Sequence, residues 1–170
     1  MIQAKICMLG ATSVGKTSLV ARFVRSLFSE KYLTSIGVKI DSKRLHVCDT
    51  ELMLMLWDLQ GDDEFQRLRS SYLRGALGLF FVADGTRRET LLTVCRLNQE
   101  FSPSPTVPRI LAVNKADLQA EWEIEEPDLL PFVRDGWTIL RTSAKTAEGV
   151  ESAFQALGQM IVAGRTGGRI

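Results

Sequence analysis

The chain has 170 residues, a length that suits one domain with one hydrophobic core. Its apolar content of 45% and charged content of 24% are ordinary for a globular protein, and its formal net charge of +1 shows no basic excess that would point to nucleic acid. The three cysteines are scattered and form no CxxC pair, so we expect thiols in a reducing compartment rather than a disulfide framework or a metal site.

Strand-like apolar runs alternate with segments of helical period, which predicts an α/β fold with a mainly parallel sheet. The expected strands are Ala4–Leu9, Val38–Cys48, Glu51–Asp58, Leu77–Ala83, Arg109–Asn114 and Trp137–Thr142. The expected helices are Lys16–Leu27, Gln66–Arg74, Arg88–Glu100, Asp128–Val133 and Val150–Ala163. Only Asp49 and Thr50 join the second and third strands. Two residues make a hairpin but not a crossover, so we expect this pair to be antiparallel and to lie at one side of the sheet.

A phosphate-binding motif follows the first expected strand. The segment Gly10-Ala11-Thr12-Ser13-Val14-Gly15-Lys16-Thr17 matches the pattern GxxxxGK[ST] and precedes a helix. Glycines let the backbone turn tightly, so that successive N–H groups face one concavity that can hold phosphate oxygens. Lys16 can reach the β- and γ-phosphates, and the Thr17 hydroxyl can bind Mg²⁺. The motif predicts a P-loop and a three-layer α/β sandwich of about six strands, mostly parallel with one antiparallel strand, and helices on both faces.

A second motif, Asn114-Lys115-Ala116-Asp117, can recognise the base of a nucleotide whose phosphates the P-loop holds. It follows the fifth expected strand. The carboxylate of Asp117 can accept two hydrogen bonds from the donor pair of guanine, which adenine lacks, and the stem of Lys115 can lie along the base. The pattern alone is weak, because Asn and Asp are common in turns. Its position after a P-loop, at the carboxyl end of a later strand, gives it meaning.

Further segments complete a resemblance. They are Ser143-Ala144-Lys145, Phe28, Tyr32–Val38 (YLTSIGV, switch I), Trp57–Gly61 (WDLQG, switch II) and Ser71–Ala76 (SYLRGA). In this order and at this spacing, the chain resembles the small GTPases of the Ras superfamily, nearest to the Rab type. The resemblance covers nearly the whole chain. It implies a GTPase domain over residues 1–163 and a flexible C-terminal tail over residues 164–170.

The resemblance also implies the residues that hold GTP or GDP with Mg²⁺. The nucleotide-binding set is Gly10, Ala11, Thr12, Ser13, Val14, Gly15, Lys16, Thr17, Ser18, Phe28, Tyr32, Ser35, Gly61, Asn114, Lys115, Asp117, Leu118, Ser143, Ala144 and Lys145. The metal set is Thr17, Ser35 and Asp58. The catalytic set is Lys16, Gly61, Asp62 and Gln60.

The chain departs from the family in both switches and in the P-loop. Asp62 stands where the family has the glutamine that orients the attacking water. A carboxylate is shorter, negatively charged and lacks the amide N–H, so we predict slow intrinsic GTP hydrolysis; Gln60 could replace the glutamine only with a rearranged backbone. Ser35 replaces a threonine and keeps its hydroxyl, which predicts a less ordered switch I. Thr12 faces the γ-phosphate region in the family, where a side chain can crowd an incoming arginine.

Two other functions stay open. Asp62 favours a non-hydrolysing, nucleotide-bound interaction module, a pseudo-GTPase. An adenine-specific P-loop kinase is disfavoured by the guanine motif. Asp84, at the end of the fourth expected strand, is interpreted as a loop or helix-capping residue.

The resemblance implies effectors, exchange factors and hydrolysis-activating proteins that bind through the switches, without nucleic acid. No apolar run is long enough to cross a bilayer, and the sequence as given shows neither a signal peptide nor a C-terminal cysteine for lipidation. We therefore expect a cytoplasmic protein that has no direct lipid anchor in this chain and meets membranes only through a partner or a missing segment.

Overall fold

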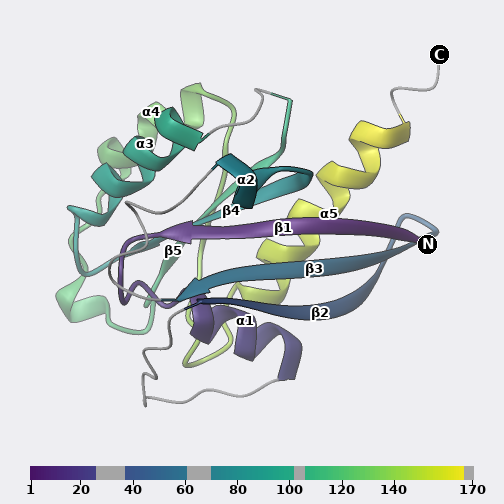
Figure 1. Cartoon of the computed structure of the whole chain (residues 1–170). Helices are drawn as coiled ribbons and strands as arrows, with labels where there is room; N and C mark the ends of the chain where they lie inside the picture. Colours follow the sequence, from purple (N-terminus) through teal and green to yellow (C-terminus); the bar gives the residue numbers. More distant parts are fainter. Residues whose placement is uncertain (26–36, 61–69, 102–105, 167–170) are drawn as a thin grey trace.

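The computed structural model describes residues 1–25, 37–60, 70–101 and 106–166 (Figure 1). Within them, the strands are β1 (Ile2–Gly10), β2 (Gly37–Val47), β3 (Thr50–Gln60), β4 (Ala76–Asp84), β5 (Arg109–Asn114) and β6 (Thr138–Arg141). The helices are α1 (Lys16–Arg25), α2 (Ser70–Leu73), α3 (Thr90–Phe101), a short 3-10 helix (Gln119–Glu121), α4 (Glu126–Arg134) and α5 (Val150–Thr166). The alternation predicted from the sequence is confirmed. The predicted end of the first helix at Leu27 and the predicted start of the second at Gln66 lie outside the described residues, and the other ends differ by at most three residues.

The strands form one sheet in the order β2-β3-β1-β4-β5-β6. Strand β1 lies in the middle, parallel to β3 on one side and to β4 on the other, and β5 and β6 continue the parallel half. Because these five strands run the same way, their carboxyl ends meet at one edge. The order reverses at β1, and such a switch point is where open α/β sheets bind ligands.

The antiparallel pair at the edge is confirmed, and its turn lies one residue earlier than predicted. Strands β2 and β3 pair from Gly37↔Gln60 to Val47↔Thr50, so the two loop residues are Cys48 and Asp49. Both have a positive φ, of 45° and 60°, as the type I′ turn favoured in two-residue hairpins requires. Thr50 therefore belongs to β3.

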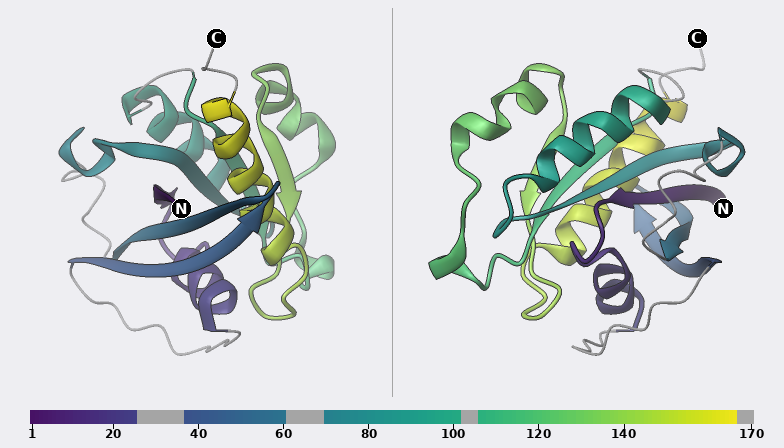
Figure 2. Two further views of the ribbon diagram at one scale, coloured as in Figure 1. Left: turned by 90° about the vertical axis from the view of Figure 1, so that its right-hand side faces the viewer. Right: turned by 60° about the vertical axis from the view of Figure 1, so that its left-hand side comes forward.

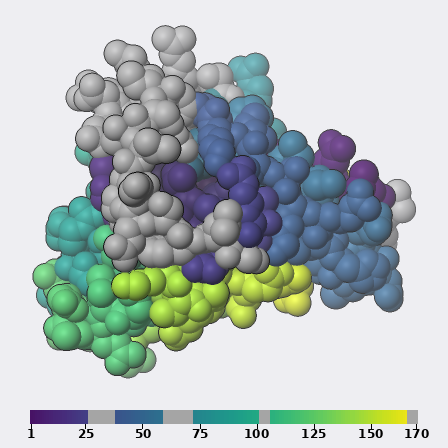
Figure 3. Space-filling model, turned by 90° about the horizontal axis from the view of Figure 1, so that it is seen from below, coloured from purple at the N-terminus to yellow at the C-terminus, as the bar shows by residue number. Residues whose placement is uncertain are grey.

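Helices cover both faces of the sheet, as the three-layer prediction requires (Figure 2). On one face, α1 and α5 enclose a core in which Phe154 stacks on Phe23 and Phe80, with ring centroids 4.0 and 4.4 Å apart. On the other face, α2, α3 and α4 pack on a second cluster that includes Phe81 and Trp137. Figure 3 shows α1, in purple, between the blue hairpin and the yellow-green segment that contains α5.

Helix α5 continues to Thr166, three residues beyond the predicted end, and residues 167–170 lie outside the described part. Among the described residues, no helix combines the length and the apolar character needed to span a membrane.

Helix α4 begins with a capping box, in which the Glu125 N–H donates to the Asp128 carboxylate at 2.8 Å and the Glu125 side chain accepts in return.

Candidate nucleotide-binding site

The P-loop joins the carboxyl end of β1 to the first turn of α1. Strand β1 ends at Gly10 and α1 begins at Lys16, so the helix directs its N-terminal N–H groups at the loop. The ammonium of Lys16 donates to the carbonyls of Gly10 and Ala11, both at 2.9 Å. The charge of this lysine is therefore held at the loop that would surround an anion.

Asn114, the last residue of β5 and the first of the base motif, connects this loop with the predicted segment Ser143-Ala144-Lys145. Its Nδ2 donates to the carbonyl of Val14 at 2.9 Å. Its Oδ1 accepts from the hydroxyl of Thr142 at 3.2 Å and from the backbone N–H of Ala144 at 3.3 Å. The side chain is 2% exposed, so these bonds are shielded from water. One amide thus places the P-loop beside the segment that the resemblance assigns to the base.

The approach of Asn114 explains the second glycine of the motif. Gly15 has a φ of +103°, which side-chain-bearing residues rarely adopt, and a Cβ built on it would overlap Nδ2 of Asn114. The loop can only pass this close to β5 because the residue has no side chain.

The base side of the site brings Asp117 and Ser143 together. The Ser143 hydroxyl donates to Oδ1 of Asp117 at 2.6 Å, and the same hydroxyl accepts from the backbone N–H of Thr146 at 3.0 Å. The loop is also held by Arg22 of α1, which donates to the carbonyls of Ala144 and Lys145 at 2.7 and 2.9 Å. A carboxylate fixed in this way can accept the paired donors of a guanine edge.

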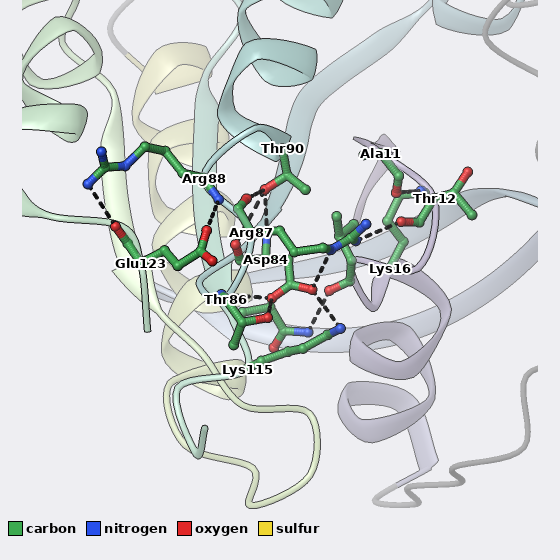
Figure 4. A network of polar contacts seen from close by, with 12 residues as sticks. Ala11, Thr12, Lys16, Asp84, Thr86, Arg87, Arg88, Thr90, Lys115 and Glu123 are labelled. Atoms are coloured by element: carbon green, nitrogen blue, oxygen red, sulfur yellow. Dashed lines mark hydrogen bonds and ion pairs between the residues drawn. The ribbon is translucent and has the colours of Figure 1, made fainter. Parts of the chain in front are cut away.

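Lys115 is anchored by Asp84 at the end of β4. Its Nζ lies 2.6 Å from Oδ2 of Asp84, a carboxylate that is fully buried. The same carboxylate accepts from the N–H and hydroxyl of Thr86 at 2.9 and 2.7 Å and from Nε of Arg87 at 3.0 Å (Figure 4). Burial raises the pKa of Asp84, but the hydrogen bonds from Lys115, Thr86 and Arg87 outweigh it and hold that pKa below its ordinary value. Asp84 is therefore ionised and fully partnered.

Two oxygen donors suited to Mg²⁺ lie beside the P-loop. The hydroxyl of Thr17 donates to Oδ2 of Asp58 at 2.5 Å, and Asp58 is 1% exposed. A hydroxyl and a buried carboxylate at this spacing fit a hard cation that prefers oxygen ligands. The described residues thus fit the metal that the sequence implies.

Comparison with known proteins agrees with this geometry. The family model described as Ras family matches residues 5–163. The chain belongs to the Ras family.

Its relatives include Ras-related protein Rab-2B of Dictyostelium discoideum, 34% identical over 93% of this chain and 80% of the relative, and Ras-related protein RABA4b of Arabidopsis thaliana, 33% identical over 90% of this chain and 70% of the relative. Ras-related protein Rab-13 of Canis lupus familiaris is 29% identical over 97% of this chain and 82% of the relative. The resemblance to a Ras-superfamily small GTPase of the Rab type is confirmed. This membership supports a GTP-binding switch GTPase in general terms.

The structure brings together some of the predicted Ras-family site residues. The P-loop, Asn114, Lys115, Asp117 and the segment around Ser143 share the carboxyl edge of the sheet, as the contacts above show. Five predicted residues lie outside the described part of the chain: Phe28, Tyr32, Ser35, Gly61 and Asp62. Gln60 ends β3, and the position of its side chain is not among the described features.

The sequence interpretation missed three supporting residues, which are Asp84, Arg87 and Arg22. Reading Asp84 as a loop residue was incomplete, because its carboxylate binds Lys115 of the base motif as well as its own loop. One signal was available in the sequence. Asp84 ends a buried strand that pairs in parallel with β5, and Lys115 follows directly after the last residue of β5, so the acid and the lysine are expected to lie close together. No local pattern marks Arg22 or the contact of Arg87 with Thr12, since both contacts reach a segment distant in the sequence.

Proposed function

We propose that this chain is a GTP/GDP-operated molecular switch that hydrolyses GTP slowly and requires Mg²⁺. The observation that carries the proposal is the side chain of Asn114, which hydrogen-bonds both the P-loop at Val14 and the base segment at Ala144. A phosphate cradle and a guanine-reading carboxylate at one sheet edge suit a guanine nucleotide, and family membership supports the same class of ligand.

The residues divide the work of binding. Lys16 and the N–H groups at the start of α1 would hold the phosphates, and Asp117, steadied by Ser143, would accept the donors of guanine. Thr17 and Asp58 would hold Mg²⁺, which when bound neutralises charge that develops on the phosphates. Catalysis would rest on positioning and electrostatics around a water that attacks the γ-phosphate.

Slow hydrolysis is proposed from the sequence, because Asp62 replaces the glutamine that orients the water in the family. The purified chain should be loaded with GTP and Mg²⁺, and the released nucleotide separated by chromatography over hours. We expect GDP to form slowly and the variant Asp62→Gln to form it faster. Equal rates in the two proteins would show that position 62 does not limit the reaction, and a parent rate like that of ordinary family members would refute the proposal.

The pseudo-GTPase is the second candidate, favoured by Asp62. GTP that remains intact in the parent throughout the incubation would establish it, whether or not Asp62→Gln restores turnover. Competition of labelled GDP by ATP tests the base. We expect GTP to displace the label and ATP to fail, and Asp117→Ala to weaken the retention of GDP. Equal displacement by ATP would contradict the guanine assignment.

We further propose that the switches bind effectors, exchange factors and hydrolysis-activating proteins. Loss of the γ-phosphate would release contacts that Ser35 and Gly61 are expected to make, which turns nucleotide state into surface shape. Pull-down of partners with GTP-loaded and GDP-loaded protein tests this. Equal recovery of every partner from both states would refute a switch.

A further inference from the structure

Arg87, in the loop between β4 and α3, binds the P-loop from outside the sequence motifs. Its Nη2 donates to the carbonyl of Thr12 at 2.9 Å, while its Nε donates to Oδ2 of Asp84 at 3.0 Å. The two residues that it joins lie on different segments, and Figure 4 shows the guanidinium between them. Because a guanidinium is planar and its donors are fixed relative to one another, it sets the spacing between the end of β4 and the P-loop.

The anchor on which Arg87 depends is shared with the base motif. Oδ2 of Asp84 accepts both Nε of Arg87 and Nζ of Lys115, the latter at 2.6 Å. The carboxylate is fully buried, and a buried charge is stable only while it stays paired. Thr12 of the P-loop is therefore linked through two ion pairs to Lys115.

The backbone around Arg87 is fixed as well. The N–H of Arg87 donates to the carbonyl of Asp84 at 3.0 Å, and its carbonyl accepts from the N–H and hydroxyl of Thr90 at 3.0 and 2.7 Å. The Thr90 hydroxyl also accepts from the N–H of Asp84 at 3.0 Å. The side chain thus extends from a rigid turn, so its reach to Thr12 does not depend on ordering a loose loop.

We propose that Arg87 is a positioning residue that holds the P-loop in its nucleotide-binding shape and slows nucleotide release. The inference rests on the proposed guanine nucleotide site and adds a determinant of its kinetics. Asn114 holds the loop at Val14 from the buried side, and Arg87 holds it at Thr12 from the accessible side. A P-loop that must widen to release phosphates has to break one of these two ties.

The test is the dissociation rate of a fluorescent GDP analogue in Mg²⁺, chased with excess unlabelled GDP. We expect Arg87→Ala to raise this rate about tenfold, the size of losing one charge-assisted hydrogen bond. The dissociation rate of Arg87→Lys should lie between those of the parent and Arg87→Ala, because an ammonium cannot donate to Asp84 and Thr12 in the fixed geometry of a guanidinium. Arg88→Ala is the matched control, since Arg88 pairs with Glu123 and Asp128 instead, and its rate should stay within twofold of the parent.

A second readout separates positioning of the P-loop from a general loss of structure. Inosine diphosphate shares the diphosphate of GDP but lacks the exocyclic amine of guanine, so the ratio of the two dissociation rates reports on the base side. Arg87→Ala should speed the dissociation of both ligands, because the P-loop would contact the diphosphate that they share. The melting temperature with saturating GDP should confirm folding, and Arg87→Gln, which keeps a donor without the charge, serves if the alanine variant does not fold.

Three results would overturn the inference. They are a dissociation rate of Arg87→Ala within twofold of the parent, an equal acceleration in Arg88→Ala, and a change confined to the ratio of the two ligands. Failure of the proposed function looks different, because the parent itself would then retain no GDP, and the inference would be lost with it.

Discussion

Truncation of Asn114 should destabilise the fold and loosen the nucleotide at once. Asn114→Ala removes three hydrogen bonds, those with Val14, Thr142 and Ala144, from a side chain that is 2% exposed. A buried hydrogen bond contributes ~1 kcal/mol net, so the free energy of unfolding should fall by about 3 kcal/mol. With m of ~2 kcal/mol/M, the urea midpoint should fall by about 1.5 M at a fixed GDP concentration.

The control for this variant is Asn98→Ala on α3, an amide whose Oδ1 makes no hydrogen bond among the described residues. It should shift the free energy of unfolding by less than ~0.5 kcal/mol. Asn114→Asp keeps the oxygen that accepts from Thr142 and Ala144 but replaces the donor toward Val14 with a second acceptor oxygen. It should release the P-loop tie while preserving the contact with Ala144. A midpoint for Asn114→Ala equal to that of the control would refute the reasoning.

Three further outcomes are expected. Gly15→Ala should weaken GDP binding at least tenfold by calorimetry, because its Cβ would overlap Asn114, whereas Gly164→Ala, with open space around it, should bind like the parent. Phe154→Ala should cost ~4 kcal/mol of unfolding free energy in urea, since the fully buried ring stacks on two other rings, and a loss below ~1 kcal/mol would contradict that packing. The pKa of Asp84 is lowered from 3.8 in the folded protein, so the ionised carboxylate stabilises the fold above that pH, and this stabilisation is lost as the pH falls through the lower folded value. The difference in unfolding free energy between parent and Asp84→Asn should therefore shrink below about pH 4. A constant difference from pH 3 to 6 would be evidence against a lowered pKa.

The sequence predicted the fold, including the P-loop between its first strand and first helix, because each of these elements relies on a local pattern. The P-loop spacing places Gly10, Gly15 and Lys16 correctly, since a strand, a tight turn and a helix follow one another along the chain. The antiparallel edge followed from the length of one connection. Its turn was displaced by a residue because Cys48 and Asp49 both adopt positive φ, which the composition of the segment does not signal.

The supporting contacts were beyond such reasoning because they join distant segments. Arg87 and Thr12 are 75 positions apart, and Arg22 and Lys145 are 123 positions apart. A long basic side chain has many possible partners, and its choice depends on which strands become neighbours. The burial of Asp84 is the physical reason Arg87 and Lys115 gather on it, since a carboxylate without exposure must be paired. That burial follows only from the assembled sheet.

The arrangement of ties implies that the two halves of the site do not loosen independently. Asn114 shares one amide between Val14 of the P-loop and Ala144 of the base segment, and Asp84 shares one oxygen between Lys115 and Arg87. Ordering the base segment therefore also orders the P-loop, and the second half to bind loses less conformational freedom than it would alone. Base and phosphate contributions to nucleotide affinity should then be more than additive, because both are transmitted through the same edge of β4 and β5.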